Sequence, residues 1–259
     1  MQDHPNAGAM TDGAIKPSWL RHQALARLAV IAAVTLLGFA LRLHQIGQTS
    51  LWSDEAFSAW WIHKPLGYLW TTGLIIETTP PLYYTLLKFW AGLLGDGDVA
   101  LRLFSATAST ATIPVVFLLG RVIAGPVVGM AAASLFALAP MQIYFAQEAR
   151  AYALLPLAFA VALLGLLRFL ASAGHRGAKA DRLALALYAA GTVGLIYAHA
   201  TSVITVAVLA GFGGLLLLCS PRRRPALPCF LLANLAVAVL AVPVFLAIPS
   251  YGRDWVMAG

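Results

Sequence analysis

Residues 200–219 read ATSVITVAVLAGFGGLLLLC, a run of 20 residues without a charged side chain. A helix needs about 20 apolar residues to cross the hydrocarbon core of a bilayer. This stretch therefore predicts a membrane-spanning helix, and the chain contains further runs of the same kind. They lie at about 24–44, 80–95, 100–120, 126–145, 151–171, 183–198 and 226–248.

The composition agrees with a membrane protein. Hydrophobic residues make up 61% of the 259 residues and charged residues 10%, with a mean hydropathy of +0.82. Soluble domains carry about 25% charged residues. The sequence shows no alternating strand pattern and no glycine-rich phosphate loop after a strand, which excludes a soluble nucleotide-binding domain. We therefore expect an all-α fold, a polytopic bundle of membrane helices.

The run at 80–95 decides how many times the chain crosses the membrane. It is the shortest run, carries Lys88 and opens with two prolines. If it crosses, the chain has eight plain spans. If it lies flat as an amphipathic helix, with Tyr83, Tyr84 and Trp90 at the interface, seven spans remain and residues 45–99 form a long external loop.

The basic residues favour the flat arrangement. It places 11 of the 17 Lys and Arg on one side, and basic residues near span ends prefer the cytosol. The cytosolic set would be Lys16, Arg21, Arg27, Arg121, Arg168, Arg176, Lys179, Arg182, Arg222, Arg223 and Arg224. The net charge of +7 is thus explained by topology, and we expect no nucleic-acid partner.

These patterns divide the chain into three parts. Residues 1–23 are expected to form a cytosolic polar tail, and residues 24–248 the transmembrane module. The first run is expected to be an uncleaved signal anchor, although its short core also resembles a signal peptide. Residues 249–259 would form an external C-terminal end.

With this topology, the ionisable residues recur at successive external turns. They are Asp54, Glu55, Glu77, Arg102, Glu148, Arg150 and, with neighbouring polar groups, Tyr152 and His199. Ionisable groups at membrane level are costly and usually face a cavity or a partner. Each also has an ordinary interpretation: a solvated helix start for the Asp54 and Glu55 pair, an ion pair for Glu148 with Arg150, and a snorkelling side chain for Arg42 or Arg102.

The chemistry that suits this set is sugar transfer from a lipid-linked donor. A carboxylate near the surface can deprotonate an acceptor hydroxyl as a general base. The leaving lipid phosphate needs an arginine or a metal ion to stabilise its developing charge. Glu77 or Glu148 could hold a divalent metal ion, the candidate cofactor, or orient the acceptor.

Six segments in order resemble the polytopic GT-C glycosyltransferases of the protein-mannosyltransferase and lipid A aminoarabinose-transferase type, the broad bacterial group often called family 39. The segments are LWSDEA (51–56), Glu77 leading into PPLYY (80–84), GDGDVALRL (95–103), LGR (119–121), the Ala139–Pro140 pair, and YFAQEARAY (144–152). They cover about residues 24–170 at plausible spacing.

The resemblance implies an inverting transferase that uses a polyprenyl-phosphate sugar on the external face of the plasma membrane. The acceptor would be a glycan, a glycolipid or a protein, and membrane lipid would surround the bundle. The implied roles are Asp54 as catalytic base, Glu55 as its neighbour in the acidic pair, Arg102 as partner of the donor phosphate, Glu77 and Glu148 as metal- or substrate-contacting carboxylates, and Arg150, Tyr152 and His199 as further substrate-binding residues.

Two other functions stay open at this point. A transporter or lipid-binding protein could use the same external acids, although transporters more commonly carry charges on broken helices at the midplane. A non-catalytic scaffold or an inactive fragment of the same fold is the third possibility. Members of the family are usually longer, so the C-terminal end is expected to be truncated relative to them.

Overall fold

The protein is described by a computed structural model over residues 18–76, 79–173 and 181–247. Within these ranges all regular structure is helical, which confirms the predicted all-α fold. The polar tail expected at 1–23 falls largely outside the described ranges, as does the C-terminal end expected at 249–259.

Five helical segments of the described chain are long and apolar enough to cross a membrane. They are His22–Leu43 in α1 (Ser18–Leu43), α6 (Asp98–Ala124), Ala151–Ala173 comprising η1 (Ala151–Ala153) and α9 (Leu154–Ala173), α11 (Ser202–Cys219), and Arg224–Ala247 comprising η2 (Arg224–Ala226) and α12 (Leu227–Ala247). The chain thus has the helices of a multi-span membrane protein.

Two further apolar segments complete the predicted set. Helices α7 (Pro126–Leu138) and α8 (Pro140–Ala146) form a pair bent by 57°, either a broken span or a re-entrant loop. Helix α10 (Arg182–Ala198) has 17 residues, slightly fewer than a typical span. Each of the seven predicted spans therefore corresponds to helix, while the count of seven crossings stays a prediction.

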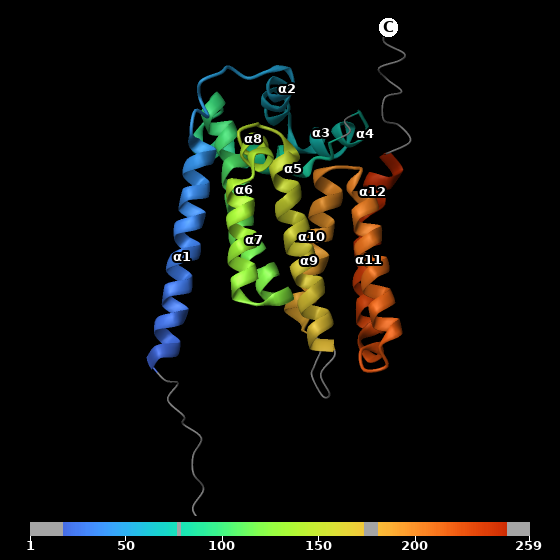
Figure 1. Cartoon of the computed structure of the whole chain (residues 1–259). Helices are drawn as coiled ribbons and strands as arrows, with labels where there is room; N and C mark the ends of the chain where they lie inside the picture. The colour runs from blue at the N-terminus through green and yellow to red at the C-terminus, as the bar shows by residue number, and fades with distance from the viewer. Residues whose placement is uncertain (1–17, 77–78, 174–180, 248–259) are drawn as a thin grey trace, which may run out of the picture.

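The long helices run side by side, and short helices lie across one end (Figure 1). Helices α2 (Ser53–Ile62), α3 (Leu66–Trp70) and α4 (Thr72–Ile76) lie at the end opposite to the start of α1. Arg121, Arg168 and Arg182 lie near the other ends of their helices, as do the arginines between α11 and α12. These arginines of the predicted cytosolic set and the described residues of the predicted site thus lie at opposite ends of the bundle.

Helix α5 (Leu82–Leu94) corresponds to the short run that decides the topology. Its 13 residues span about 20 Å, which is less than the hydrocarbon thickness of about 30 Å. Tyr83 and Tyr84 are 1% and 2% exposed, so the expectation that they face the interface is wrong. The Tyr84 ring stacks on Trp61 of α2, and the Tyr83 ring packs edge-on against Tyr84, so both tyrosines belong to an aromatic cluster inside the protein. Trp90 is half-buried and donates a hydrogen bond to the Ala100 carbonyl at 2.9 Å.

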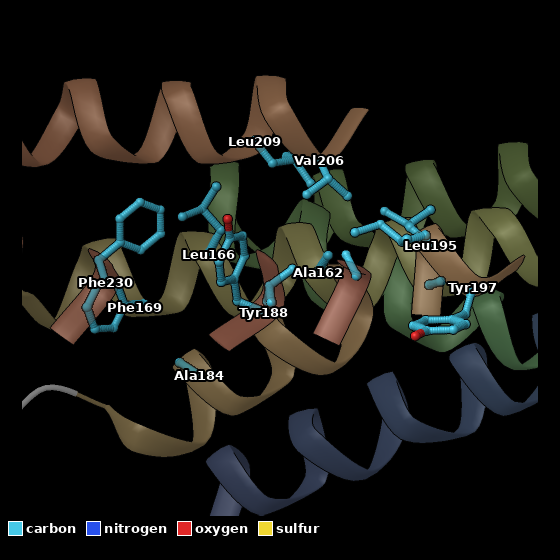
Figure 2. Close-up of a cluster of buried hydrophobic side chains, with 14 of the residues drawn as sticks. Ala162, Leu166, Phe169, Ala184, Tyr188, Leu195, Tyr197, Val206, Leu209 and Phe230 are labelled. Carbon is cyan, nitrogen blue, oxygen red and sulfur yellow. The ribbon is translucent and has the colours of Figure 1, made fainter. Parts of the chain in front are cut away.

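The closest packing within the bundle lies between α9 and α10 (Figure 2). A Cβ atom on Gly165 would run into the backbone of Tyr188 and Ala184, so a side chain at position 165 has no room. Close approach at small residues is the usual way in which membrane helices associate. The Tyr188 hydroxyl, buried in the same region, donates to Asn234 Oδ1 at 2.7 Å.

Arg42, near the end of α1, is fully buried rather than snorkelling. Its Nε donates to Ser109 Oγ at 2.8 Å, and its Nη atoms donate to the carbonyls of Ala137 at 3.1 Å and Phe136 at 3.4 Å. The last carbonyls of a helix lack intrahelical partners, and Pro140, which follows the break, has no N–H to offer. Arg42 therefore joins α1 to the broken end of α7.

Candidate functional site

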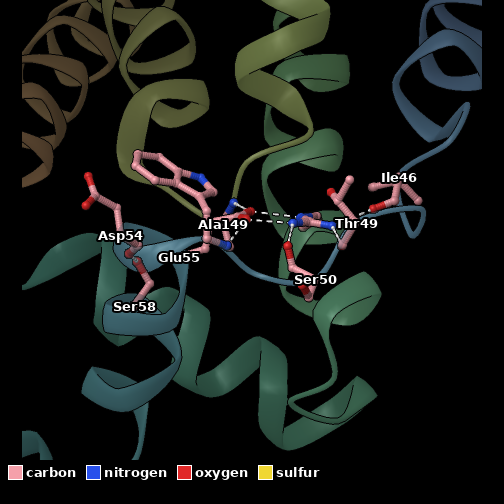
Figure 3. Close-up of polar contacts among 9 residues, drawn as sticks. Ile46, Thr49, Ser50, Asp54, Glu55, Ser58 and Ala149 are labelled. Carbon is pink, nitrogen blue, oxygen red and sulfur yellow. Dashed lines mark hydrogen bonds and ion pairs between the residues drawn. The ribbon is translucent and has the colours of Figure 1, made fainter.

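Several of the predicted site residues meet where α2 begins, directly after the loop that follows α1 (Figure 3). Asp54 and Glu55 occupy the first turn of α2, where the helix dipole favours negative side chains. Consecutive residues of a helix point in different directions, and these two carboxylates have different surroundings. Glu55 is fully buried, whereas the Asp54 side chain is 43% exposed and points away from the Glu55 contacts.

Glu55 is held by four hydrogen bonds. Arg102 donates through Nε to Oε1 at 2.8 Å and through Nη2 to Oε2 at 2.6 Å, a bidentate pair. The backbone N–H groups of Ala149 and Trp52 donate to the same carboxylate at 2.8 and 3.3 Å. Burial on its own would raise the pKa of Glu55, but these hydrogen bonds and the Arg102 charge hold it below the ordinary value. The charged carboxylate thus ties α2, α6 and the 147–150 segment together.

Arg102 was predicted to pair with the donor phosphate, but each of its five N–H groups already has a protein acceptor. Besides the two bonds to Glu55, Nη1 donates to the carbonyls of Ile46 at 3.0 Å and Thr49 at 2.7 Å, and Nη2 donates to the Ser50 carbonyl at 3.1 Å. A guanidinium has five N–H donors in total. This arrangement favours a structural role for Arg102, and the phosphate contact stays a prediction.

The loop after α1 is also held by Gln147. Its Nε2 donates to the His44 carbonyl at 2.7 Å and to the Arg42 carbonyl at 3.3 Å. Together with Arg102, it therefore provides donors for five carbonyls between residues 42 and 50. Within this loop Gln45 has φ of 64°, the left-handed conformation that favours glycine.

Asp54 lies beside Arg150 in a looser arrangement. Arg150 Nη2 is 3.6 Å from Asp54 Oδ2, and Nη1 donates to the Asp54 carbonyl at 3.3 Å. The Arg150 guanidinium also lies 5.8 Å from the centre of the Tyr152 ring. Compared with Arg102, the contacts of Arg150 are long. Arg150 is therefore better placed to exchange a protein contact for an anionic ligand.

Two cavities flank this site. A polar cavity of about 290 Å³ lies against Glu55, Arg102 and Glu148. A larger groove of about 670 Å³ begins at Tyr152 and runs between α8, α9, α10 and the start of α11. The groove is lined by Gln142, Phe145, Tyr152, Leu155, Pro156, Phe159, Leu195, Thr201, Ser202 and Thr205. The exposed Asp54 carboxylate belongs to the same end of the bundle as both cavities.

The remaining predicted residues lie in different places. Glu148 is 8% exposed and lines the polar cavity; burial raises its pKa, and the Glu55 and Asp54 charges add to this. His199 follows α10, and its Nδ1 lies 2.9 Å from the hydroxyl of Thr201, a residue of the groove. Glu77 lies outside the described residues.

A metal ion is not supported by the described part of the site. Over residues 18–76, 79–173 and 181–247, no three His, Cys, Asp or Glu side chains come together as a metal-binding group. The predicted metal site combines Glu148 with Glu77, and it stays a prediction because Glu77 is not described. No step below depends on a metal ion.

Several residues of the site had no predicted role. Trp52 and Tyr144 lie inside the segments that carry the resemblance, and their aromatic character was the only signal that the sequence offered. Gln147 also lies in one of these segments, YFAQEARAY (144–152), whereas Gln45 gave no signal, because a glutamine near a span end is ordinary.

No protein-family model matches the chain, and a search of curated proteins finds no significant match.

Proposed function

We propose that the chain is a membrane glycosyltransferase of the GT-C type. It transfers a sugar, with inversion, from a polyprenyl-phosphate donor to a glycan, glycolipid or protein acceptor. Asp54 is the general base, and Arg150 binds the donor phosphate. The reaction takes place on the external face of the plasma membrane, with the N-terminus of the chain in the cytosol.

One observation carries this proposal: Arg150 lies between the exposed carboxylate of Asp54 and the Tyr152 end of the groove. A polyprenyl-phosphate sugar has an apolar tail, an anionic phosphate and a polar ring in that order. The groove, with its largely apolar lining, suits the tail, and the guanidinium suits the phosphate. The sugar ring then lies next to Asp54.

The proposed reaction is a single displacement. Asp54 accepts the proton of the acceptor hydroxyl while the hydroxyl oxygen forms a bond to the anomeric carbon of the donor sugar. The bond between that carbon and the phosphate oxygen breaks, and its electron pair leaves with polyprenyl phosphate. Arg150 stabilises the charge that develops on this leaving oxygen. The products are the glycosylated acceptor and polyprenyl phosphate.

Glu55 and Arg102 support this reaction indirectly. Their ion pair fixes the first turn of α2, which carries Asp54, against the 147–150 segment, which carries Arg150. Catalytic groups need supporting contacts of this kind because small displacements cost rate. The exposed carboxylate and the buried one thus have different tasks.

The test is a transfer assay in proteoliposomes that contain radiolabelled polyprenyl-phosphate sugars and membrane glycolipid. Asp54→Asn should lower transfer or donor hydrolysis by about 10²–10⁴-fold, the usual contribution of a general base. Asp96→Asn is the matched control, because Asp96 is an exposed acid (62%) paired at 3.4 Å with His63.

The control variant should keep the wild-type rate. Equal rates for the wild type and Asp54→Asn would reject Asp54 as the base and favour a scaffold role. A panel of donors that gives no product with the wild-type protein would count against transferase activity itself.

A further inference from the structure

The polar cavity of about 290 Å³ has no part in the donor arrangement proposed above. The floor of the cavity is formed by the buried side chains of Glu55, Arg102 and Glu148, and its rim by exposed residues. The rim residues are Gln45, Thr49, Trp52 and Tyr144, with Ile46 and Gln147 between rim and floor. A cavity of this size suits one small ligand.

The lining indicates a neutral ligand with many hydroxyl groups. Glu55 and Arg102 neutralise each other and have used their hydrogen-bonding capacity on protein groups, so this pair adds no net charge to the cavity. The remaining polar groups are the amides of Gln45 and Gln147, two hydroxyls, the Trp52 indole N–H and the Glu148 carboxyl group, which bond well to alcohols. Trp52, 45% exposed, adds a flat apolar surface. Hydroxyl groups around an apolar face are the chemistry of a sugar ring.

Gln45 strengthens this argument. Its φ of 64° is a conformation in which glycine costs least and a long side chain is strained. Strained residues of this kind persist where the surrounding structure holds them, and they gather at binding sites. The surrounding loop is held by Gln147 and Arg102, so the backbone of Gln45 is held at the rim of the cavity, which its side chain lines.

We propose that this cavity binds one neutral sugar ring, with Trp52 against its face and Gln45 and Glu148 bonded to its hydroxyls. Naming that ring as part of a glycan or glycolipid acceptor rests on the proposed function. The position is compatible with an acceptor, because Glu55, which lines the floor of the cavity, directly follows Asp54 in the first turn of α2.

The binding test does not need turnover. The full chain in nanodiscs is titrated with the methyl glycosides of glucose, mannose and galactose, and binding is followed by saturation-transfer NMR, which detects millimolar affinities. Gln45→Gly removes the amide while relieving the backbone strain, so folding is not at risk. It should weaken binding about twofold to tenfold, the effect of losing one neutral hydrogen bond.

Tryptophan substitutions provide a matched pair. Trp52→Leu should weaken binding about tenfold, and combining it with Gln45→Gly should abolish the signal. Trp60→Leu is the control, because Trp60 of α2, the helix that begins directly after Trp52, has a similar exposure (47%) and does not line the cavity. Equal losses from both tryptophan variants would overturn the assignment, as would the absence of a saturable signal from all three glycosides.

The same titration separates this inference from the proposed function. Asp54→Asn should lose transfer and keep glycoside binding, because Asp54 does not line the cavity. Active transfer together with glycoside binding that ignores Gln45→Gly and Trp52→Leu would overturn the cavity assignment alone. Glycoside binding that depends on both residues, in a protein without transfer activity, would support the cavity and count against the transferase.

Discussion

Replacing Glu55 by glutamine tests the division of tasks between the two neighbouring acids. Glutamine keeps the size of the side chain but removes its charge and exchanges one acceptor oxygen for an NH₂ group. In the protein, all four contacts of the Glu55 carboxylate come from N–H donors. The new NH₂ group would therefore face a donor of Arg102, Trp52 or Ala149, and the Arg102 guanidinium would be left buried without its counter-charge.

The expected cost follows from the burial of the pair. The side chains of Glu55 and Arg102 are 1% and 5% exposed, and breaking a buried ion pair by removing one partner costs about 3–5 kcal/mol. A loss of about 3 kcal/mol would lower the unfolding midpoint by roughly 6–12 °C in a protein of this size. Asp54→Asn, one residue earlier and half-exposed, should change the midpoint by less than about 2 °C.

The measurement is thermal unfolding of the detergent-purified protein, followed by tryptophan fluorescence. A double-mutant cycle adds Arg102→Met alone and together with Glu55→Gln. The two substitutions should cost less together than the sum of their separate effects, because the double variant leaves no unpaired buried charge. A Glu55→Gln midpoint within about 2 °C of the wild type, or additive effects in the cycle, would refute the structural role of this pair.

The pH dependence of unfolding gives an independent check. The pKa of Glu55 is lower in the folded protein than in the unfolded chain, where it is about 4.3. The pair therefore stabilises the protein fully above that unfolded value, and the stabilisation is lost as pH falls through the lower folded pKa. The wild type and Glu55→Gln should differ most near pH 7 and converge as pH falls below about 4.3 and then through the lower folded pKa of Glu55. A difference that is constant over this range would contradict the assigned charge state.

Three further substitutions have clear expectations. Arg42→Met should destabilise the protein by about 1–3 kcal/mol, because it removes the donor of the Ala137 carbonyl at the end of α7; the unfolding midpoint measures this, and an unchanged midpoint would contradict it. Gly165→Ala should cost about 1–3 kcal/mol by forcing α9 away from α10, whereas Gly211→Ala, with open space around it, should be neutral or stabilising by up to about 1 kcal/mol. Arg150→Met should lower transfer by about 10²–10³-fold while unfolding near the wild-type midpoint; equal transfer rates would exclude Arg150 as the phosphate ligand.

The helical architecture was readable from the sequence because apolar run length is a direct physical requirement of the bilayer. Each predicted run from 24–44 to 226–248 corresponds to helix, including the short run that became α5. The sequence also contained the Ala139–Pro140 pair, where α7 ends and α8 begins. The run at 126–145 was predicted as one span, so this break was not predicted; α6 continues past Pro114, so a proline on its own does not show where a helix breaks.

The roles of the charged residues were not readable in the same way. Asp54 and Glu55 are chemically similar neighbours, and only the positions of Arg102 and Ala149, far away along the chain, decide which carboxylate is buried. The sequence analysis assigned the donor phosphate to Arg102, but the protein contacts of Arg102 and Arg150 differ in number and length. That several of these charged residues lie at one end of the bundle was thus predictable, whereas the contacts of each residue depended on the tertiary structure.

Arg42 has a consequence for how the protein is made. Its acceptors on α6 and α7 lie 67 to 95 residues further along the chain, so they do not yet exist when α1 leaves the ribosome. A cationic side chain near the end of a newly inserted helix would meanwhile stay among the lipid headgroups. The guanidinium reaches these partners only after α6 and α7 have been made, so the packing around the helix made first is completed by later segments.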